Sequence, residues 1–208
     1  MTARNSRMLL MAAAFLAGLA LCFGVVLILA GRLSSPVAQQ IAAIGGPFKL
    51  VDQNGQVVTD QDLKGHPFLV FFGFTHCPDV CPTTLFEVSE ILRALGPDAD
   101  RTRALFITVD PERDTPDVLK KKAAEMNAQP GRWVFLTGTK EQIDAAARAM
   151  LQVRPGPGDN PLMHSTRFLL FDAQNRCRGR YDSADEAELA KLTKDAAMLS
   201  TQAKGAKQ

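Results

Sequence analysis

Residues 67–84 read PFLVFFGFTHCPDVCPTT, and this stretch decides the fold of the chain. Residues 67–74 are an unbroken apolar run, which is typical of a strand buried on both faces of a sheet. Residues 85–95 then carry leucine, isoleucine and valine at helical spacing, and the pair Gly96 and Pro97 ends that pattern. The sequence therefore predicts a buried strand, a short loop with two cysteines, and a helix.

Cys77 and Cys81 lie where this strand meets the helix, which is where open α/β sheets place their sites. Pro78 disfavours a helical conformation at Cys77, and Pro82 suits the first position of a helix. Cys81 is therefore expected near the N-cap, where free backbone N–H groups and the helix dipole favour thiolate over thiol. Two cysteines at this spacing can form a disulfide, and they can equally bind one metal ion.

The rest of the chain alternates predicted strands and helices, which indicates an α/β sheet covered by helices. In the first hairpin, Asn54 and Gly55 are expected to supply the positive φ angles of a tight turn. Residues 48–52 and 53–58 together are expected to form this hairpin. Further strands are expected at 103–109, 133–136, 166–172 and 177–181, helices at 116–127, 140–151 and 185–199, and a loop at 153–161.

Residues 8–30 form a 23-residue stretch without charge, which at about 1.5 Å rise per residue can cross a hydrocarbon core roughly 30 Å thick. Arg4 and Arg7 precede it and only Arg32 closely follows, so the positive-inside rule predicts a cytoplasmic N-terminus. A cleaved signal peptide is the alternative, but the stretch is longer than an h-region and lacks a clean cleavage site. We expect a single-pass protein of the cytoplasmic (inner) membrane, with its soluble domain in the periplasm.

The chain thus divides into five expected segments. These are a cytoplasmic N-terminus at 1–7, a transmembrane anchor at 8–30, a tether at 31–46, a folded domain at 47–199, and a frayed tail at 200–208.

The composition excludes several classes of protein. Residues 31–208 hold 22 basic and 22 acidic side chains, so this part is neutral, which argues against a nucleic-acid-binding face. A hydrophobic content of 46% with 22% charged residues argues against disorder and against a polytopic membrane protein. Four cysteines are too few for a disulfide scaffold. Cys22 lies inside the apolar stretch, and Cys177 is interpreted as a buried free thiol on a face shared with Tyr181.

A metal ion at the two cysteines needs a third ligand, and the chain has three histidines. His66 precedes a strand and is most simply a surface residue, while His76 adjoins Cys77, and consecutive side chains rarely converge on one metal. His164 lies at the end of the Gly/Pro loop, directly before an expected strand. Two thiolates and an imidazole form a soft ligand set suited to Cu(I). A zinc site would need a fourth ligand, and the sequence has no second paired ligand motif to supply one.

Three features resemble the Sco/SenC family of copper chaperones for cytochrome c oxidase assembly: the segment FFGFTHCPDVCPTTL, the later VDPERDTP, and the histidine before an apolar strand in MHSTRFLLFD, all behind one N-terminal anchor. The resemblance covers residues 47–199. It implies a thioredoxin-like fold, here behind a single N-terminal transmembrane helix, and copper, as Cu(I) or Cu(II), bound by Cys77, Cys81 and His164.

The resemblance also implies a partner and a task. Copper would be delivered to the dinuclear copper site of cytochrome c oxidase subunit II, or the cysteines of that site would be reduced, outside the cytoplasmic membrane. Other periplasmic copper carriers or thiol reductants are further expected partners.

One residue departs from the family pattern. Many members place aspartate immediately before the ligand histidine, and this chain has Met163 there. If that aspartate orients the imidazole, another carboxylate must replace it, and Asp110 and Asp159 are candidates. The Met163 thioether could also approach copper as a weak axial ligand, although packing at the strand edge is the simpler interpretation.

Other functions use the same two cysteines. In a thiol-disulfide oxidoreductase, Cys77 and Cys81 would exchange electrons and copper would be incidental. A plain stabilising disulfide is a further alternative, but so short a loop constrains little of the unfolded chain. A peroxidase of the peroxiredoxin type would leave Cys81 and His164 without a role. His164 discriminates between these functions, because thiol exchange does not need a distant imidazole.

The arginine asymmetry around residues 8–30 predicts the topology of the chain. External protease added to spheroplasts should degrade residues 31–208, and a cytoplasmic marker protein in the same cells should stay intact. Complete protection of the domain would reverse the expected orientation.

Overall fold

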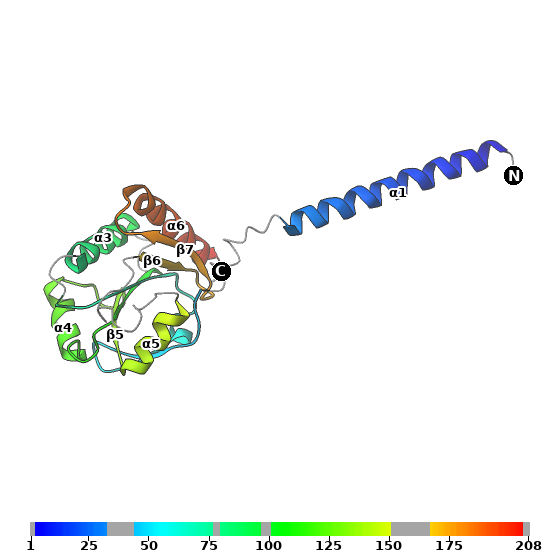
Figure 1. Ribbon diagram of the computed structural model, residues 1–208. Coiled ribbons are helices and arrows are strands. Elements are labelled where there is room, and N and C mark those ends of the chain that lie inside the picture. The colour runs from blue at the N-terminus through cyan, green and yellow to red at the C-terminus, as the bar shows by residue number, and fades with distance from the viewer. Residues whose placement is uncertain (1–2, 33–43, 77–79, 97–100, 151–166, 206–208) are drawn as a thin grey trace. The chain divides into compact units, whose positions relative to one another are not determined.

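A mixed β-sheet forms the centre of the domain (Figure 1). Its strand order is β2-β1-β5-β4-β3-β6-β7. The computed structural model describes residues 3–32, 44–76, 80–96, 101–150 and 167–205. Its strands are β1 (Lys49–Asp52), β2 (Val57–Thr59), β3 (Phe68–Gly73), β4 (Arg103–Thr108), β5 (Trp133–Thr137), β6 (Arg167–Phe171) and β7 (Cys177–Asp182). Its helices are α1 (Ala3–Arg32), α3 (Val80–Ala94), α4 (Pro116–Glu125), α5 (Lys140–Ala149) and α6 (Glu186–Gly205), and a 3-10 helix, η1 (Asp60–Leu63), follows β2.

Strand β3 lies between β4, which runs parallel to it, and β6, which runs antiparallel. Its register with β4 extends from Phe68 opposite Arg103 to Gly73 opposite Thr108. All six residues of β3 are buried, which confirms the prediction of a strand covered on both faces. Helix α3 is the crossover that a parallel neighbour requires, so the cysteine segment begins at the carboxyl end of β3.

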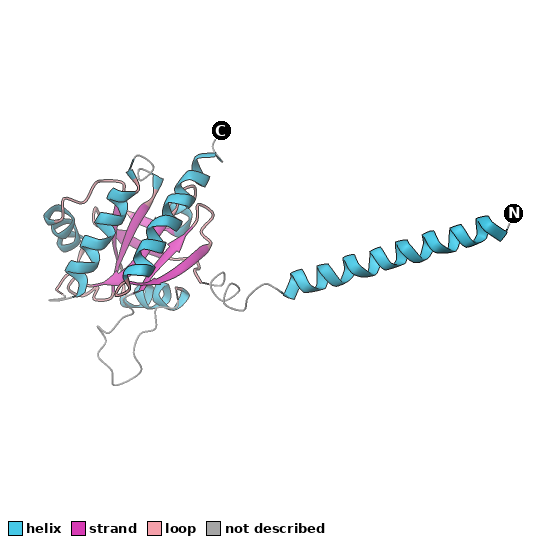
Figure 2. Cartoon of the chain, turned by 90° about the horizontal axis from the view of Figure 1, so that it is seen from above, coloured by secondary structure: helices cyan, strands magenta, loops and turns pink. Residues whose placement is uncertain are grey.

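Helices cover the two faces of this sheet (Figure 2), and an apolar layer lies on each face. On one face, Leu69, Phe71 and Phe106 pack against side chains of α3, α4 and α6. On the other face, Val70 and Phe72 pack against α5 and the segment before β1. Burying each such side chain contributes about 1.5–3 kcal/mol to stability. The expected α/β sheet covered by helices is confirmed.

The contacts divide the chain into two units, residues 1–40 and residues 41–208. In the first unit, α1 includes all of the apolar stretch at residues 8–30, and the apolar side chains described there are mostly exposed. Across the described residues, no helix combines the length and the apolar character that a membrane crossing requires. The assignment of residues 8–30 as an anchor stays a prediction, and most of the expected tether lies outside the described residues.

Both hairpins turn through three-residue loops, and this corrects one prediction. Asn54 does not have a positive φ; only Gly55 does, at 78°. The N–H of Gly55 donates to the carbonyl of Asp52 at 3.0 Å, and the left-handed residue comes last in the loop. The hairpin of β6 and β7 repeats this arrangement, with Asn175 at φ 61° donating to the carbonyl of Asp172. In each loop the aspartate carboxylate also accepts two backbone N–H groups.

Helix α3 begins at Val80, two residues before Pro82, which was expected at the first helical position. Pro82 lies in its first turn, where a backbone N–H has no helical partner to lose. The first turn therefore belongs to the helix, although the regular apolar spacing begins only at Leu85.

Helix α6 continues to Gly205, so the predicted end at Leu199 and the expected frayed tail are wrong up to that residue. Ser200 is completely buried, and its Oγ lies 2.5 Å from Oγ1 of Thr102, just before β4. Ala203 is also buried. These contacts fix the extra turns to the sheet, and residues 206–208 lie outside the described part.

Cys177 is a buried free thiol, as the sequence predicted. It is 4% exposed on the face of β7 that also buries Tyr181, and its Sγ lies 3.5 Å from the carbonyl oxygen of Gly179. Burial raises the pKa of the Cys177 thiol to about 11.

Because only the thiolate is nucleophilic, Cys177 in the native chain should react with iodoacetamide at about pH 8 on the order of 100-fold more slowly than an ordinary thiol. Mass spectrometry of the alkylated peptides measures this rate, and the same chain in denaturant is the control. Equal rates in both states would show that the thiol is not buried.

Candidate metal and thiol site at the end of strand β3

The cysteine segment joins the end of β3 to the start of α3. Strand β3 ends at Gly73, and Thr75 and His76 follow it directly before Cys77. Residues 77–79 lie outside the described residues. Cys81 was predicted near the N-cap and is the second residue of α3, two positions beyond the N-cap. It therefore lies in the turn whose backbone N–H groups have no helical partners.

Most of the predicted site residues lie outside the described part of the structure. These are Cys77, His164, Asp159 and Met163. The structure therefore neither brings them together nor separates them, and the copper ligand set stays a prediction. Among the residues that are described, no group of three or more His, Cys, Asp or Glu side chains could hold a metal ion.

Asp110, one of the candidate partners for the ligand imidazole, lies two residues beyond β4. Its carboxylate forms an ion pair with the Arg113 guanidinium, and its backbone N–H donates to Oγ1 of Thr108 at 2.9 Å. The side chain is therefore bound within its own turn, and its role toward His164 stays a prediction.

A buried carboxylate that the sequence analysis did not single out lies beside the cysteine segment. Asp114 is completely buried, and its Oδ2 accepts hydrogen bonds from the backbone N–H of Thr75 at 3.0 Å and from Oγ1 of Thr108 at 2.6 Å. Its Oδ1 accepts the hydroxyl of Thr75 at 2.5 Å. These three bonds satisfy the carboxylate and join the end of β4 to the turn that follows β3.

His76 extends this network toward solvent. Its Nδ1 lies 3.0 Å from Oγ1 of Thr75 and 3.8 Å from Oδ1 of Asp114, and its side chain is 56% exposed. The segment VDPERDTP entered the sequence analysis through the family resemblance, and the helix predicted from Pro116 is correct because Thr115 caps α4. The segment gives no local signal for the role of Asp114, because Thr75 comes from the end of another strand.

Helix α3 also carries an unpartnered acid. Oε2 of Glu87 is buried without a hydrogen-bond partner, and burial raises the pKa of this carboxyl. Its neighbour Phe86 is exposed. These two residues follow Cys81 along the helix, and in the described part of the chain Glu87 belongs to no group of three or more His, Cys, Asp or Glu side chains that could hold a metal ion.

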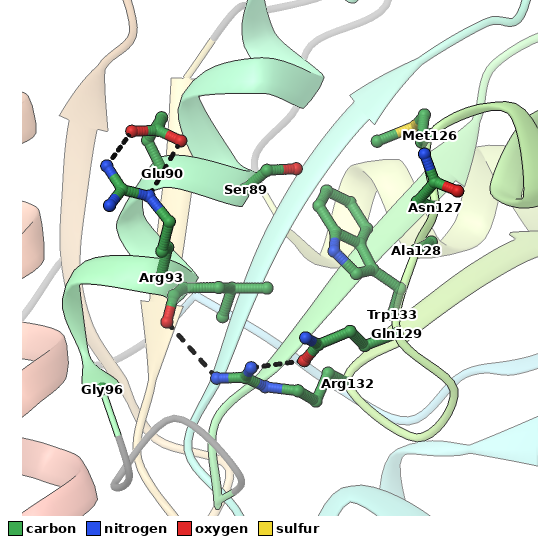
Figure 3. Close-up of a pocket in the computed structure, with 11 residues that line it drawn as sticks. Ser89, Glu90, Arg93, Gly96, Met126, Asn127, Ala128, Gln129, Arg132 and Trp133 are labelled. Carbon is green, nitrogen blue, oxygen red and sulfur yellow. Dashed lines mark hydrogen bonds and ion pairs between the residues drawn. The ribbon is translucent and has the colours of Figure 1, made fainter.

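A cavity of about 320 Å³ lies at the other end of α3, between that helix and the start of β5 (Figure 3). Arg132 donates there to the carbonyl of Leu92 at 3.3 Å and to the side chain of Gln129, and Arg93 is paired with Glu90. Both guanidinium groups therefore bind protein partners. The cavity lies at the amino ends of the parallel strands β4 and β5. The cysteine segment starts at the carboxyl end of β3, which is parallel to β4.

Comparison with known proteins identifies the family. A family model described as SCO1/SenC matches residues 36–198. An SCO2-like protein of Rickettsia prowazekii is 47% identical over 100 residues, which are 48% of this chain and 47% of that protein, so the match spans about half of the relative's length.

Solved structures agree with this assignment. ScoI of Bradyrhizobium japonicum with copper bound is 41% identical, with a TM-score of 0.63 over 76% of this chain and 99% of that one. BsSco, a protein with a disulfide switch and a member of the Sco family of cytochrome c oxidase assembly proteins, is 27% identical, with a TM-score of 0.66 over 77% and 95% of the two chains. The matched segment includes the whole described sheet and the cysteine motif, and the chain therefore belongs to the SCO1/SenC family.

Proposed function

We propose that this chain is a copper-binding protein of cytochrome c oxidase assembly, with copper as its cargo. The observation that carries the proposal is the position of the cysteine segment, between a buried parallel strand and the first turn of α3. The similar ScoI was solved with copper bound, and BsSco belongs to a family of oxidase assembly proteins.

The donor chemistry of the proposed site suits copper. Thiolates of Cys77 and Cys81 and the imidazole of His164 would hold the ion, a soft set that Cu(I) prefers and that gives Cu(II) a strong thiolate bond. The place of Cys81 in the first turn of α3 supports this assignment, because the helix dipole stabilises a thiolate there.

The acceptor we propose is the dinuclear copper site of cytochrome c oxidase subunit II. The chain would deliver copper to that site or reduce its cysteines, while residues 8–30 hold the domain on the periplasmic side of the inner membrane. Periplasmic copper carriers or thiol reductants would load the site or keep it reduced.

Thiol-disulfide exchange is the second candidate function, because BsSco has a disulfide switch. Cys77 and Cys81 would then be the exchanging pair, and a thiolate stabilised at the start of α3 would be the attacking group. The two functions differ in their need for His164, which only copper binding uses.

The reduced full-length chain should bind one copper ion, and Cys77→Ser or Cys81→Ser should abolish tight binding, because a hydroxyl is a poor ligand for Cu(I). Metal analysis after gel filtration measures the stoichiometry. Cys177→Ala, which changes a buried cysteine outside the motif, should bind like the unchanged chain. Full affinity in either serine variant would contradict the proposal, as would tight binding by the oxidised chain.

His164→Ala should separate the two candidate functions. Disulfide formation between Cys77 and Cys81 should survive, whereas affinity for Cu(II), which prefers nitrogen ligands, should fall about tenfold or more, with a smaller loss for Cu(I). The variant should fail to support oxidase activity at limiting copper in cells that lack the unchanged copy. Normal oxidase activity together with a measured loss of copper binding would favour thiol exchange instead.

A further inference from the structure

We propose that Asp114 is a positioning residue that acts through Thr75 to hold His76 as a nitrogen donor beside Cys77, where the imidazole receives Cu(I) on its way to the proposed site. The observation behind the proposal is that the completely buried carboxylate of Asp114 accepts hydrogen bonds from both the backbone N–H and the hydroxyl of Thr75. The inference rests on the proposed function for the identity of the metal, but the arrangement of the three side chains can be tested without copper.

The first step concerns the backbone. Two hydrogen bonds fix Asp114 itself. Its carboxylate accepts the hydroxyl of Thr108, the last residue of β4, and its backbone N–H donates to the carbonyl of Asp110 at 2.9 Å. From this fixed position it accepts the N–H of Thr75, two residues beyond the end of β3. The chain is therefore fixed, at a point two residues before Cys77, to the connection that follows β4.

The second step concerns the proton on the imidazole of His76. The hydroxyl of Thr75 has one hydrogen, and it donates that hydrogen to Oδ1 of Asp114. Its oxygen can then only accept at the 3.0 Å contact with Nδ1, so Nδ1 carries the hydrogen. A neutral imidazole with hydrogen on Nδ1 has a free lone pair on Nε2.

The third step concerns what this lone pair can do. The His76 side chain is 56% exposed, and the residue adjoins Cys77 in the sequence. An imidazole Nε2 binds copper readily, and its orientation by an outer carboxylate is the usual way in which proteins fix such a ligand. Because consecutive side chains rarely bind one metal together, His76 should affect the rate at which copper arrives more than the final affinity.

The tautomer of His76 can be measured on the metal-free full-length chain. Long-range ¹⁵N–¹H spectra, recorded where the imidazole signals no longer change with rising pH, should show hydrogen on Nδ1. Thr75→Val removes the hydroxyl and keeps the backbone bond to Asp114, so the Nδ1–H form should lose its dominance. Thr75→Ser restores a hydroxyl and should restore the Nδ1–H form, which a merely structural role for this residue would not predict.

The transfer of Cu(I) from a coloured chelator complex, followed by stopped-flow absorbance, tests the donor role. His76→Gln, Thr75→Val and Asp114→Asn should each slow transfer about tenfold, while the final stoichiometry stays at the unchanged value. If Asp114→Asn does not fold, the valine and serine variants at position 75 carry the test alone.

Asp172→Asn provides a matched control. Like Asp114, Asp172 is a buried aspartate whose carboxylate accepts backbone N–H groups, two in its case. Its loss should therefore destabilise the fold in a similar way. It follows Phe171, which lies opposite Phe68 at the amino end of β3, so the length of the strand separates it from His76. This variant should keep both the Nδ1–H form of His76 and the unchanged transfer rate.

The outcomes separate this inference from the proposed function. An unchanged chain that binds no copper would refute the proposed function, and with it the donor role, while the spectra would still decide the Asp114 arrangement. Hydrogen on Nε2 of His76 in a chain that binds one copper would overturn the inference alone. A His76→Gln variant that takes up Cu(I) at the unchanged rate would overturn it as well.

Discussion

Strand β3 is hydrogen-bonded along both edges and covered by helices on both faces, and this confinement organises the domain. Successive side chains of β3 enter two separate apolar layers. A shift of the strand register by one residue would move each side chain into the wrong layer and disrupt both layers. The register with β4 then fixes Gly73 beside Thr108, and from there the carboxylate of Asp114 reaches the turn that follows β3. The chemistry at the end of the strand depends on this register.

Much of the fold could be predicted from the sequence because its elements have strong local patterns. The apolar run at 67–74 and the turn residues between the last two strands predicted β3 and the β6–β7 pair with ends within about two residues. The errors came where tertiary contacts or loop length decide. The buried contact of Ser200 with Thr102 extends α6, and the three-residue loop makes a positive φ at Asn54 unnecessary.

The candidate site could be predicted in part. Cys77 and Cys81 are visible in the sequence because their spacing next to a buried strand has a chemical meaning of its own. Asp114 has no such local signal for its role, because its partner Thr75 follows the end of β3 and its partner Thr108 is the last residue of β4. Only the parallel pairing of β3 and β4 brings these groups together, and that pairing is a property of the fold.

The placement of α6 has a consequence for synthesis of the chain on the ribosome. Strand β3 is made early, but its antiparallel neighbour β6 and the helix that covers its face come from residues 167–205. Until those residues have been made and have joined the rest of the domain, one edge and much of one face of β3 have no partner. The nascent domain therefore cannot complete its sheet in the order in which the strands are made. Its apolar surface stays exposed until α6 is complete, and a chaperone that shields such surface would act during that time.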